Sequence, residues 1–165
     1  MPMLRSGPST QRGFTLVEAL VAMTILAVLA GMSAASFSWL NQTTRIRSAA
    51  FDLVADLDFA RSEAIKRNGD AVIAPVGGSW NNGWTVAAGG TTLRQRGALG
   101  AQVAFVTPEP AALTYNAAGR VTFGNGNPFQ ICPPSRGTIS GRTIRVDASG
   151  LSRSTKTLCA VPTGT

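Results

Sequence analysis

The chain has 165 residues, a net charge of +7, two cysteines and no histidine. The commonest general base and metal ligand is therefore absent. No nucleophile–base pair, paired-acid site or metal cluster can be assembled from the remaining side chains, so we expect no enzyme, no metal and no other cofactor.

Residues 14–38 form an apolar run in which Glu18 is the single charged side chain. A helix of this length reaches roughly 37 Å at about 1.5 Å per residue, which exceeds a hydrocarbon core of about 30 Å. We therefore predict that residues 14–38 span a membrane. A cleaved secretory signal is the alternative, with Ser33-Ala34-Ala35 as its cleavage site, although such signals have shorter apolar cores without an internal acid.

Glu18 requires a partner, because a carboxylate inside a bilayer costs roughly 2.5–3.5 kcal/mol at the centre and less near an end. Residues 13–18 (GFTLVE) follow Arg12 and resemble the leader signal of type IV pilins and type II secretion pseudopilins. The resemblance implies that a prepilin peptidase removes residues 1–13 by cutting after Gly13, and that Phe14 becomes an N-methylated terminus. Glu18 would then neutralise the terminal amine of a neighbouring subunit, and paired charges are less costly in lipid than separate ones.

The same resemblance implies a location and partners. It implies a single-pass protein of the bacterial inner membrane, with a periplasmic head, which is extracted into a pilus or pseudopilus beside other pilins. Charge alone does not fix this orientation, because Arg5 and Arg12 precede the run while Arg45 and Arg47 follow it closely.

Residues 39–68 are predicted to continue the helix as an amphipathic half. Their apolar side chains recur at three- and four-residue steps and form one stripe, which comprises Ile46, Ala50, Leu53, Val54, Leu57, Ala60, Ala64 and Ile65. No proline interrupts residues 14–67, and Asn68-Gly69 is a typical stop signal. One long helix is therefore expected.

Charged side chains occupy the other side of this helix. Two sets have the spacing of helical ion pairs, namely Asp58 with Arg61, and Glu63 with Lys66 and Arg67. The acids at positions 52, 56 and 58 lack the turn and the carbonyl ligands of a calcium loop. We therefore expect Asp52, Asp56 and Asp58 to form a solvated helix face rather than a cation site.

Residues 69–165 have the pattern of a β-rich head, with short apolar runs separated by Gly, Asn and Pro. Eight or nine strands are predicted, at residues 71–74, 84–88, 92–96, 102–106, 112–115, 120–123, 129–132, 142–147 and 157–161. Strands this short cannot bury themselves, so the apolar stripe of the helix is their expected partner. The predicted fold class is α+β, with a long N-terminal helix on a single sandwich-like head.

Three further segments indicate which family of pilin-like proteins the chain resembles. Residues 59–68, 80–84 and 113–120 (FARSEAIKRN, WNNGW and LTYNAAGR) are similar to the H-type minor pseudopilins and the FimT and FimU minor pilins. This family implies a pilin-like fold and a low-copy subunit near the filament tip that helps to initiate or cap the filament. The sequence does not distinguish a type II secretion system, a type IV pilus and a competence pseudopilus. Trp80 and Trp84 are expected to pack at the edge of the core rather than to bind a ligand.

Cys132 and Cys159 are expected to form a disulfide, because the implied head folds in an oxidising periplasm. In the chain-entropy model, a loop of this length gains roughly 3–4 kcal/mol of stability from the bridge. Free thiols are the alternative. The bridge would tie the C-terminal tail to the end of an inner strand.

Positive charge is concentrated in the last third of the chain. Residues 14–109 carry seven basic and seven acidic side chains, whereas residues 110–165 carry six basic side chains and Asp147 as the single acid. Such a surface suits contacts with DNA phosphates, although a soluble basic domain shows the same asymmetry. DNA binding is therefore the alternative function, and the resemblance to the FimT branch implies that it would serve natural transformation.

Some members of the FimT branch bind DNA through a C-terminal Gly-Arg-x-Arg motif. Here the matching turn, residues 150–153 (GLSR), lacks the first arginine, and residues 141–145 (GRTIR) are one residue too long. In a strand, Arg142 and Arg145 would point to opposite faces, which disfavours one shared patch unless Arg142 belongs to the turn. The candidate DNA contacts are Arg142, Arg145, Arg153 and Lys156.

Overall fold

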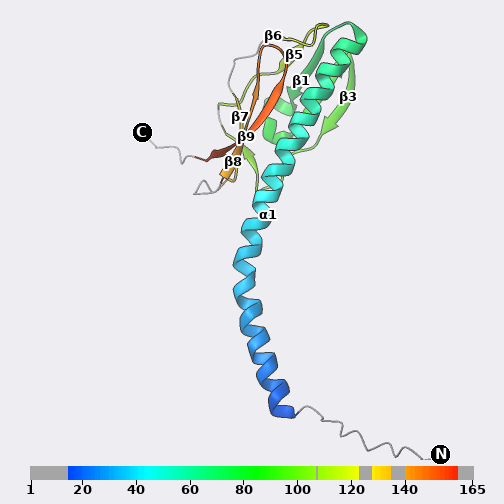
Figure 1. The fold of residues 1–165 in the computed structure, drawn as a ribbon. Helices are drawn as coiled ribbons and strands as arrows, with labels where there is room; N and C mark the ends of the chain where they lie inside the picture. Colours follow the sequence, from blue (N-terminus) through cyan, green and yellow to red (C-terminus); the bar gives the residue numbers. More distant parts are fainter. Residues whose placement is uncertain (1–14, 107, 123–127, 135–139, 160–165) are drawn as a thin grey trace, which may run out of the picture. The chain divides into compact units, whose positions relative to one another are not determined.

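The computed structural model of the chain describes residues 15–106, 108–122, 128–134 and 140–159, and of residues 32–39 it describes the backbone alone. Within these residues, a long helix is followed by nine strands and two short 3-10 turns (Figure 1). The chain divides into two compact units, Met1–Ser38 and Trp39–Thr165, and the helix α1 (Leu16–Arg67) contributes residues to both. The predicted α+β class is confirmed.

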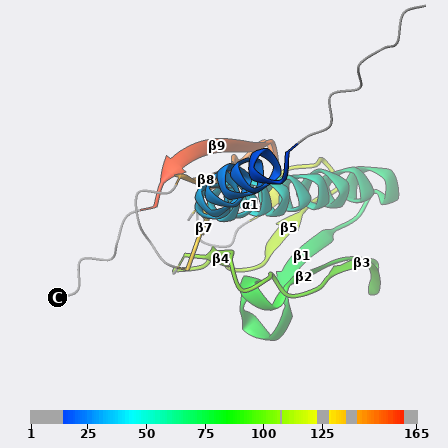
Figure 2. The same cartoon turned by 90° about the horizontal axis from the view of Figure 1, so that it is seen from below.

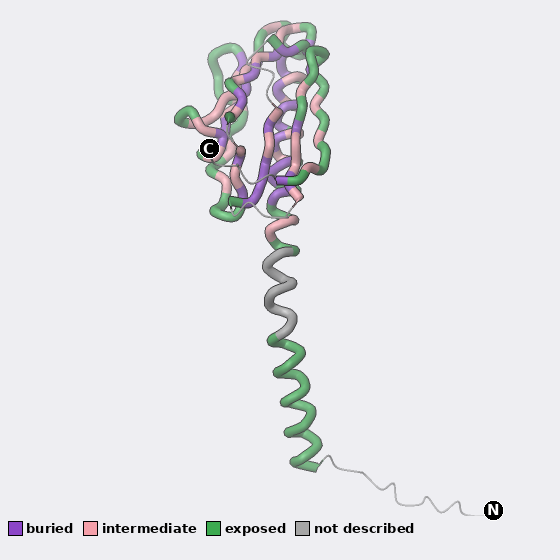
Figure 3. The backbone as a smooth tube through the Cα atoms, turned by 90° about the vertical axis from the view of Figure 1, so that its left-hand side faces the viewer, coloured by how far each residue is buried: buried purple, intermediate pink, exposed green. Residues whose placement is uncertain are grey.

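The first part of α1 exposes its described side chains, which are those of residues 16–31 (Figure 3). Among the described residues, no helix combines the length and the apolar character needed to cross a membrane. The predicted leader at residues 1–13, Phe14, and the side chains of residues 32–39 lie outside the described residues. The leader and the membrane span therefore stay predictions.

The later part of α1 packs on the strands through the predicted stripe as far as Ala64, whereas Ile65, which was also predicted to belong to it, is 50% exposed. Leu53, Leu57 and Ala60 are completely buried, and Figure 3 shows the buried positions gathered on this part of the helix and on the strands. The helix ends where predicted, because Asn68 adopts a φ of 49° and the N–H of Gly69 donates to the carbonyl of Ala64 at 3.1 Å. This αL ending satisfies carbonyl groups that the last helical turn leaves open.

The strands form two antiparallel sheets within Trp39–Thr165. The first sheet has the order β3-β2-β1-β5-β6 and comprises β1 (Ala71–Pro75), β2 (Trp84–Ala88), β3 (Thr91–Arg96), β5 (Leu113–Tyr115) and β6 (Val121–Thr122). The second has the order β4-β7-β8-β9 and comprises β4 (Ala104–Phe105), β7 (Phe129–Cys132), β8 (Ser140–Val146) and β9 (Ser152–Leu158). Figure 2 shows β1, β2 and β3 grouped together and β8 and β9 grouped apart from them.

An aromatic cluster joins the two sheets in the core. Trp80 lies in a 3-10 turn (Trp80–Asn82) before β2, and its ring packs against Trp84 of β2 and against Phe105 and Phe129 of the second sheet, at centroid distances of 4.7–6.2 Å. Trp80 is completely buried and Trp84 is 2% exposed. Both tryptophans therefore pack in the core as expected, but as buried members of the cluster between the sheets rather than at the edge of the core.

Glu109 fixes the turn that carries this cluster. Its carboxylate accepts hydrogen bonds from the backbone N–H of Trp80 at 2.7 Å, from the side-chain amide of Asn81 at 2.8 Å and from the hydroxyl of Ser79 at 3.1 Å. The side-chain oxygen of Asn81 in turn accepts from the backbone N–H of Phe105 at 2.8 Å. The WNNGW segment thus connects the first sheet to β4 by both polar and apolar contacts.

The last strand differs from its prediction. The apolar pattern predicts a strand at residues 157–161, but β9 begins at Ser152 and ends at Leu158, and residues 160–161 lie outside the described residues. β9 is an edge strand held by pairing along its whole length with β8, from Val146↔Ser152 to Ser140↔Leu158. Its side chains are mostly polar and exposed, so the pairing partner determines the strand rather than an apolar pattern.

Candidate functional site

Glu18 lies in the first turn of α1, at the end of the chain where the leader signal predicts assembly contacts. The helix begins at Leu16, and the hydroxyl of Thr15 accepts a hydrogen bond from the backbone N–H of Glu18 at 3.3 Å. Thr15 is therefore the N-cap, and Glu18 occupies the third helical position, where a capping box places Glu or Gln. Within the described residues, the carboxylate of Glu18 has no hydrogen bond or ion pair.

This placement gives Glu18 a capping role in its own helix, beside the pairing role that the leader signal implies. An acid in the first turn interacts favourably with the helix dipole, by about 0.3–1 kcal/mol at an exposed position. The capping role needs only a Glu or Gln side chain, whereas the pairing role implied by the leader signal needs a negative charge. Gly13 and Phe14, the predicted cleavage and methylation residues, lie outside the described residues.

Asp56 contradicts the expected solvated acidic face. Its side chain is completely buried, and its two carboxylate oxygens accept hydrogen bonds from three donors. Oδ2 accepts from Nε of Arg96 at 2.8 Å and from the indole N–H of Trp84 at 3.0 Å, and Oδ1 accepts from Nη1 of Arg94 at 3.0 Å. The guanidinium of Arg94 also lies 3.7 Å from the centre of the Phe59 ring. Asp56 therefore fixes α1 to β2 and β3.

The charges around Asp56 are mutually compensated. Burial by itself would raise the pKa of Asp56, but hydrogen bonds from Arg96, Arg94 and Trp84 outweigh burial and leave this pKa below its ordinary value. The same contacts, led by the hydrogen bond to Asp56, raise the pKa of Arg96. An ionised acid with three fixed donors serves as an anchor, because a general base needs a pKa near the working pH. Asp52 pairs only loosely, with 3.5 Å to Nη2 of Arg96.

Of the remaining predicted ion pairs, those of Glu63 form and that of Asp58 with Arg61 does not. Glu63 contacts Arg67 at 2.7 Å and Lys66 at 3.4 Å, as its spacing predicts. Asp58 and Arg61 take other partners, because the hydroxyl of Ser152 donates to Asp58 at 2.6 Å and Nε of Arg61 donates to the carbonyl of Gly119 at 3.1 Å. These two contacts join α1 to the turn between β8 and β9 and to the turn between β5 and β6.

The four candidate DNA contacts lie on β8 and β9 but divide between two faces. Arg142 lies directly opposite Lys156, and Arg145 lies directly opposite Arg153. Because side chains alternate along a strand, each opposed pair shares a face and the two pairs occupy different faces. Arg145 and Arg153 are both exposed, and Arg142 is half-buried. The prediction that Arg142 and Arg145 do not form one patch is confirmed.

The face with Arg142 and Lys156 lies toward α1. A cavity of about 260 Å³ between them is lined by Thr43, Ile46, Arg47, Ser140, Gly141, Arg142 and Lys156. A second cavity of about 200 Å³ shares Arg47 and Arg142 with the first and extends to Phe51, whose side chain is 65% exposed. The helix therefore adds a third basic side chain, Arg47, to the two that β8 and β9 provide.

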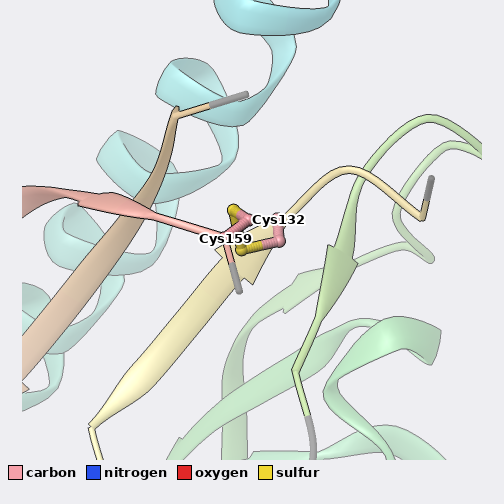
Figure 4. The surroundings of a disulfide bond; sticks show 2 residues. All are labelled: Cys132 and Cys159. Carbon is pink, nitrogen blue, oxygen red and sulfur yellow. A yellow bond between two sulfur atoms is a disulfide. The ribbon is translucent and has the colours of Figure 1, made fainter. Parts of the chain in front are cut away.

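Cys132 and Cys159 form the predicted disulfide, which joins the end of β7 to the residue after β9 (Figure 4). β7 lies between β4 and β8, so the bridge ties the C-terminal segment to an inner strand, as expected. Gly141 of β8 passes directly beneath the bridge. A Cβ atom at this position would meet both sulfur atoms and the carbonyl oxygen of Ile131, which explains why a glycine interrupts the strand.

The sequence patterns did not predict the contacts of Asp56 or the place of Arg47 in the cavity, and the reasons differ. Asp56 lies four residues before the buried Ala60 and thus on the apolar stripe, and Arg94 and Arg96 share one face of a strand, so a signal for their pairing was present. The contribution of Arg47 to the cavity depends on how the second sheet docks on α1, which no local pattern encodes. In the described residues, no cluster of His, Cys, Asp or Glu could hold a metal ion.

Comparisons with known proteins agree with this geometry. The family model described as type II transport protein GspH matches residues 49–150, and that of the prokaryotic N-terminal methylation motif matches residues 8–34. Two crystal forms of the type IV minor pilin FimU of Pseudomonas aeruginosa are similar in structure. The first is 26% identical, with a TM-score of 0.56 over 67% of this chain and 87% of the FimU chain, and the second is 25% identical, with a TM-score of 0.54 over 66% and 91%. No curated protein matches the chain.

Proposed function

This chain belongs to the GspH family of type II transport proteins, and we propose that it acts as a minor subunit that initiates or caps a type IV filament. The family and the fold are those of structural pilin subunits rather than enzymes. The observation that carries the proposal is the combination of the N-terminal methylation motif at residues 8–34 with a GspH head at residues 49–150. The N-terminal motif would direct assembly into a filament, and the head would make the contacts that distinguish this subunit from others.

The proposed route begins at the membrane. Residues 14–38 anchor the precursor in the inner membrane with the head in the periplasm, and a prepilin peptidase cuts between Gly13 and Phe14. The new N-methylated terminus of one subunit carries a positive charge, and Glu18 of its neighbour provides the negative charge. Each charge is costly in lipid, so pairing them stabilises the assembled filament and sets the register between subunits. The partners are other pilins or pseudopilins and the peptidase.

A pair of substitutions separates this role of Glu18 from its role in the helix cap. Glu18→Gln retains the third-position side chain of a capping box but removes the charge, whereas Thr15→Ala removes the cap hydroxyl and retains the charge. We expect Glu18→Gln to abolish incorporation into sheared filaments and Thr15→Ala to leave it nearly unchanged, as measured by immunoblotting of the filament fraction. Normal incorporation of Glu18→Gln would contradict the proposal.

DNA binding is a second candidate, favoured by the exposed pair formed by Arg145 and Arg153. Two arginines directly opposite each other on neighbouring strands place positive charge on one open face, which suits the phosphate backbone of a duplex. The full chain should shift duplex DNA at low salt and lose it steeply as the salt concentration rises. Arg145→Gln with Arg153→Gln should abolish the shift, whereas Arg120→Gln, in the turn between β5 and β6, should retain it. A chain that gives no shift at low salt would exclude this function.

A further inference from the structure

The cavity between α1 and the β8–β9 hairpin has the composition of an anion site. Its charged lining consists of Arg47 from α1, Arg142 from β8 and Lys156 from β9, and no acid occurs among the described residues that line it. These three side chains make no ion pair with any described residue. Three cations thus converge from three elements around one space without a negative partner.

This arrangement brings like charges together, with Arg142 half-buried and with Arg47 and Lys156 exposed. Arg142 and Lys156 are direct neighbours across the β8–β9 ladder, and like charges in such positions destabilise a sheet. The other arginines that point from strands toward α1, Arg94 and Arg96, are both compensated by Asp56. An anion held between Arg47, Arg142 and Lys156 would provide the same compensation from outside the chain.

The shape and the donors of the cavity indicate which anion fits. Guanidinium groups bind phosphate oxygens in a two-pronged manner, and a lysine adds a point charge. Ser140 contributes a hydroxyl group to the lining, and Ile46, which is 2% exposed, forms an apolar floor that strengthens the electrostatic attraction. The volume of about 260 Å³ is far above the roughly 15 Å³ that holds one water molecule.

We propose that this cavity binds a phosphate group. The group can come from the headgroup of an anionic phospholipid or from free phosphate. The lipid source rests on the proposed membrane anchor, because Thr43 and Arg47 follow the predicted span of residues 14–38 closely in the sequence. The free-phosphate source does not depend on that anchor, so the two sources can be tested separately from the proposed filament role.

The test uses the full chain in a detergent without phosphorus, with inorganic phosphate titrated calorimetrically at constant ionic strength. We expect saturable binding that Arg142→Gln weakens by about tenfold or more, as the loss of a charge-assisted hydrogen bond predicts. Arg120→Gln is the control, because it removes the same charge from an exposed position in the turn between β5 and β6, and it should leave the affinity unchanged. Lys156→Gln, at an exposed position, gives a second variant that should fold normally and bind more weakly.

A second titration distinguishes the sources with short-chain phosphatidylglycerol below its micellar concentration. The headgroup is the source if this lipid binds more tightly than inorganic phosphate does and if Arg142→Gln removes its binding. Binding of inorganic phosphate alone identifies free phosphate. The proposal is overturned if neither probe binds, if only duplex DNA binds, or if Arg142→Gln and Arg120→Gln weaken binding equally, since equal losses would show a diffuse surface charge.

Discussion

Replacement of Asp56 by Asn is the sharpest test of how the head is held to α1. The wild-type carboxylate offers two oxygens to Arg94, Arg96 and the indole of Trp84, at 2.8–3.0 Å. An Asn side chain offers one oxygen, so if that oxygen serves Arg96 and Trp84, its amide N–H groups face the donor of Arg94. The substitution also removes a completely buried charge that pairs with both arginines, and it leaves Arg96 with only its looser contact to Asp52.

The expected loss is about 3 kcal/mol. Breaking a fully buried charge network costs roughly 3–5 kcal/mol, and we take the lower end because the side chains of Arg94 and Arg96 are 44% and 40% exposed and can regain water. For a head of this size, such a loss lowers Tm by about 10 °C. Asp52→Asn is the matched control, one helical turn earlier and 45% exposed, and it should cost less than about 1 kcal/mol.

The assay is thermal unfolding of the full chain at several pH values. The folded pKa of Asp56 is depressed, so its contribution is fully present above its ordinary pKa of about 3.9 and is lost as pH falls from there toward the folded pKa. The stability gap between the wild type and Asp56→Asn should therefore be constant at neutral pH and narrow below about pH 4. The reasoning would be refuted if Asp56→Asn unfolded within 2 °C of Asp52→Asn at pH 7.

Two further predictions concern the disulfide. Gly141→Ala should lower Tm and slow oxidation of the Cys132–Cys159 pair, because the new Cβ would meet both sulfur atoms, whereas Gly97→Ala, which meets nothing within 4 Å, should be tolerated. Equal melting temperatures of the two variants would show that β8 can move away from the bridge. Replacing both cysteines by Ser should cost about 3.5 kcal/mol by the chain-entropy model, and a thiol assay on the unfolded wild-type chain should detect no free thiol.

The parts of the fold that follow from local patterns could be predicted from the sequence. The stripe from Ile46 to Ala64 has helical spacing, and the strands at 84–88 and 129–132 have the boundaries that the apolar pattern predicts. The prediction for β9 was wrong, because a polar edge strand takes its conformation from its neighbour. For the same reason, no local pattern shows that Arg142 and Lys156 lie opposite each other on β8 and β9.

The candidate sites show the same division. Glu18 could be identified from its position in an apolar run, because the cost of a charge there is a property of the local sequence. Asp56 was missed although it lies on the apolar stripe, because an acid on a helix is usually solvated and its partners are two arginines about forty residues later. Arg47 joins Arg142 and Lys156 only after the second sheet has docked on α1.

The most direct test of the filament assignment is mass spectrometry of the N-terminal peptide of this chain, recovered from sheared filaments of its own cells. We predict a peptide that begins at Phe14 and carries one methyl group on its amine. A chain that is absent from the filament fraction, or one that still carries residues 1–13, would contradict the proposed role in a type IV filament.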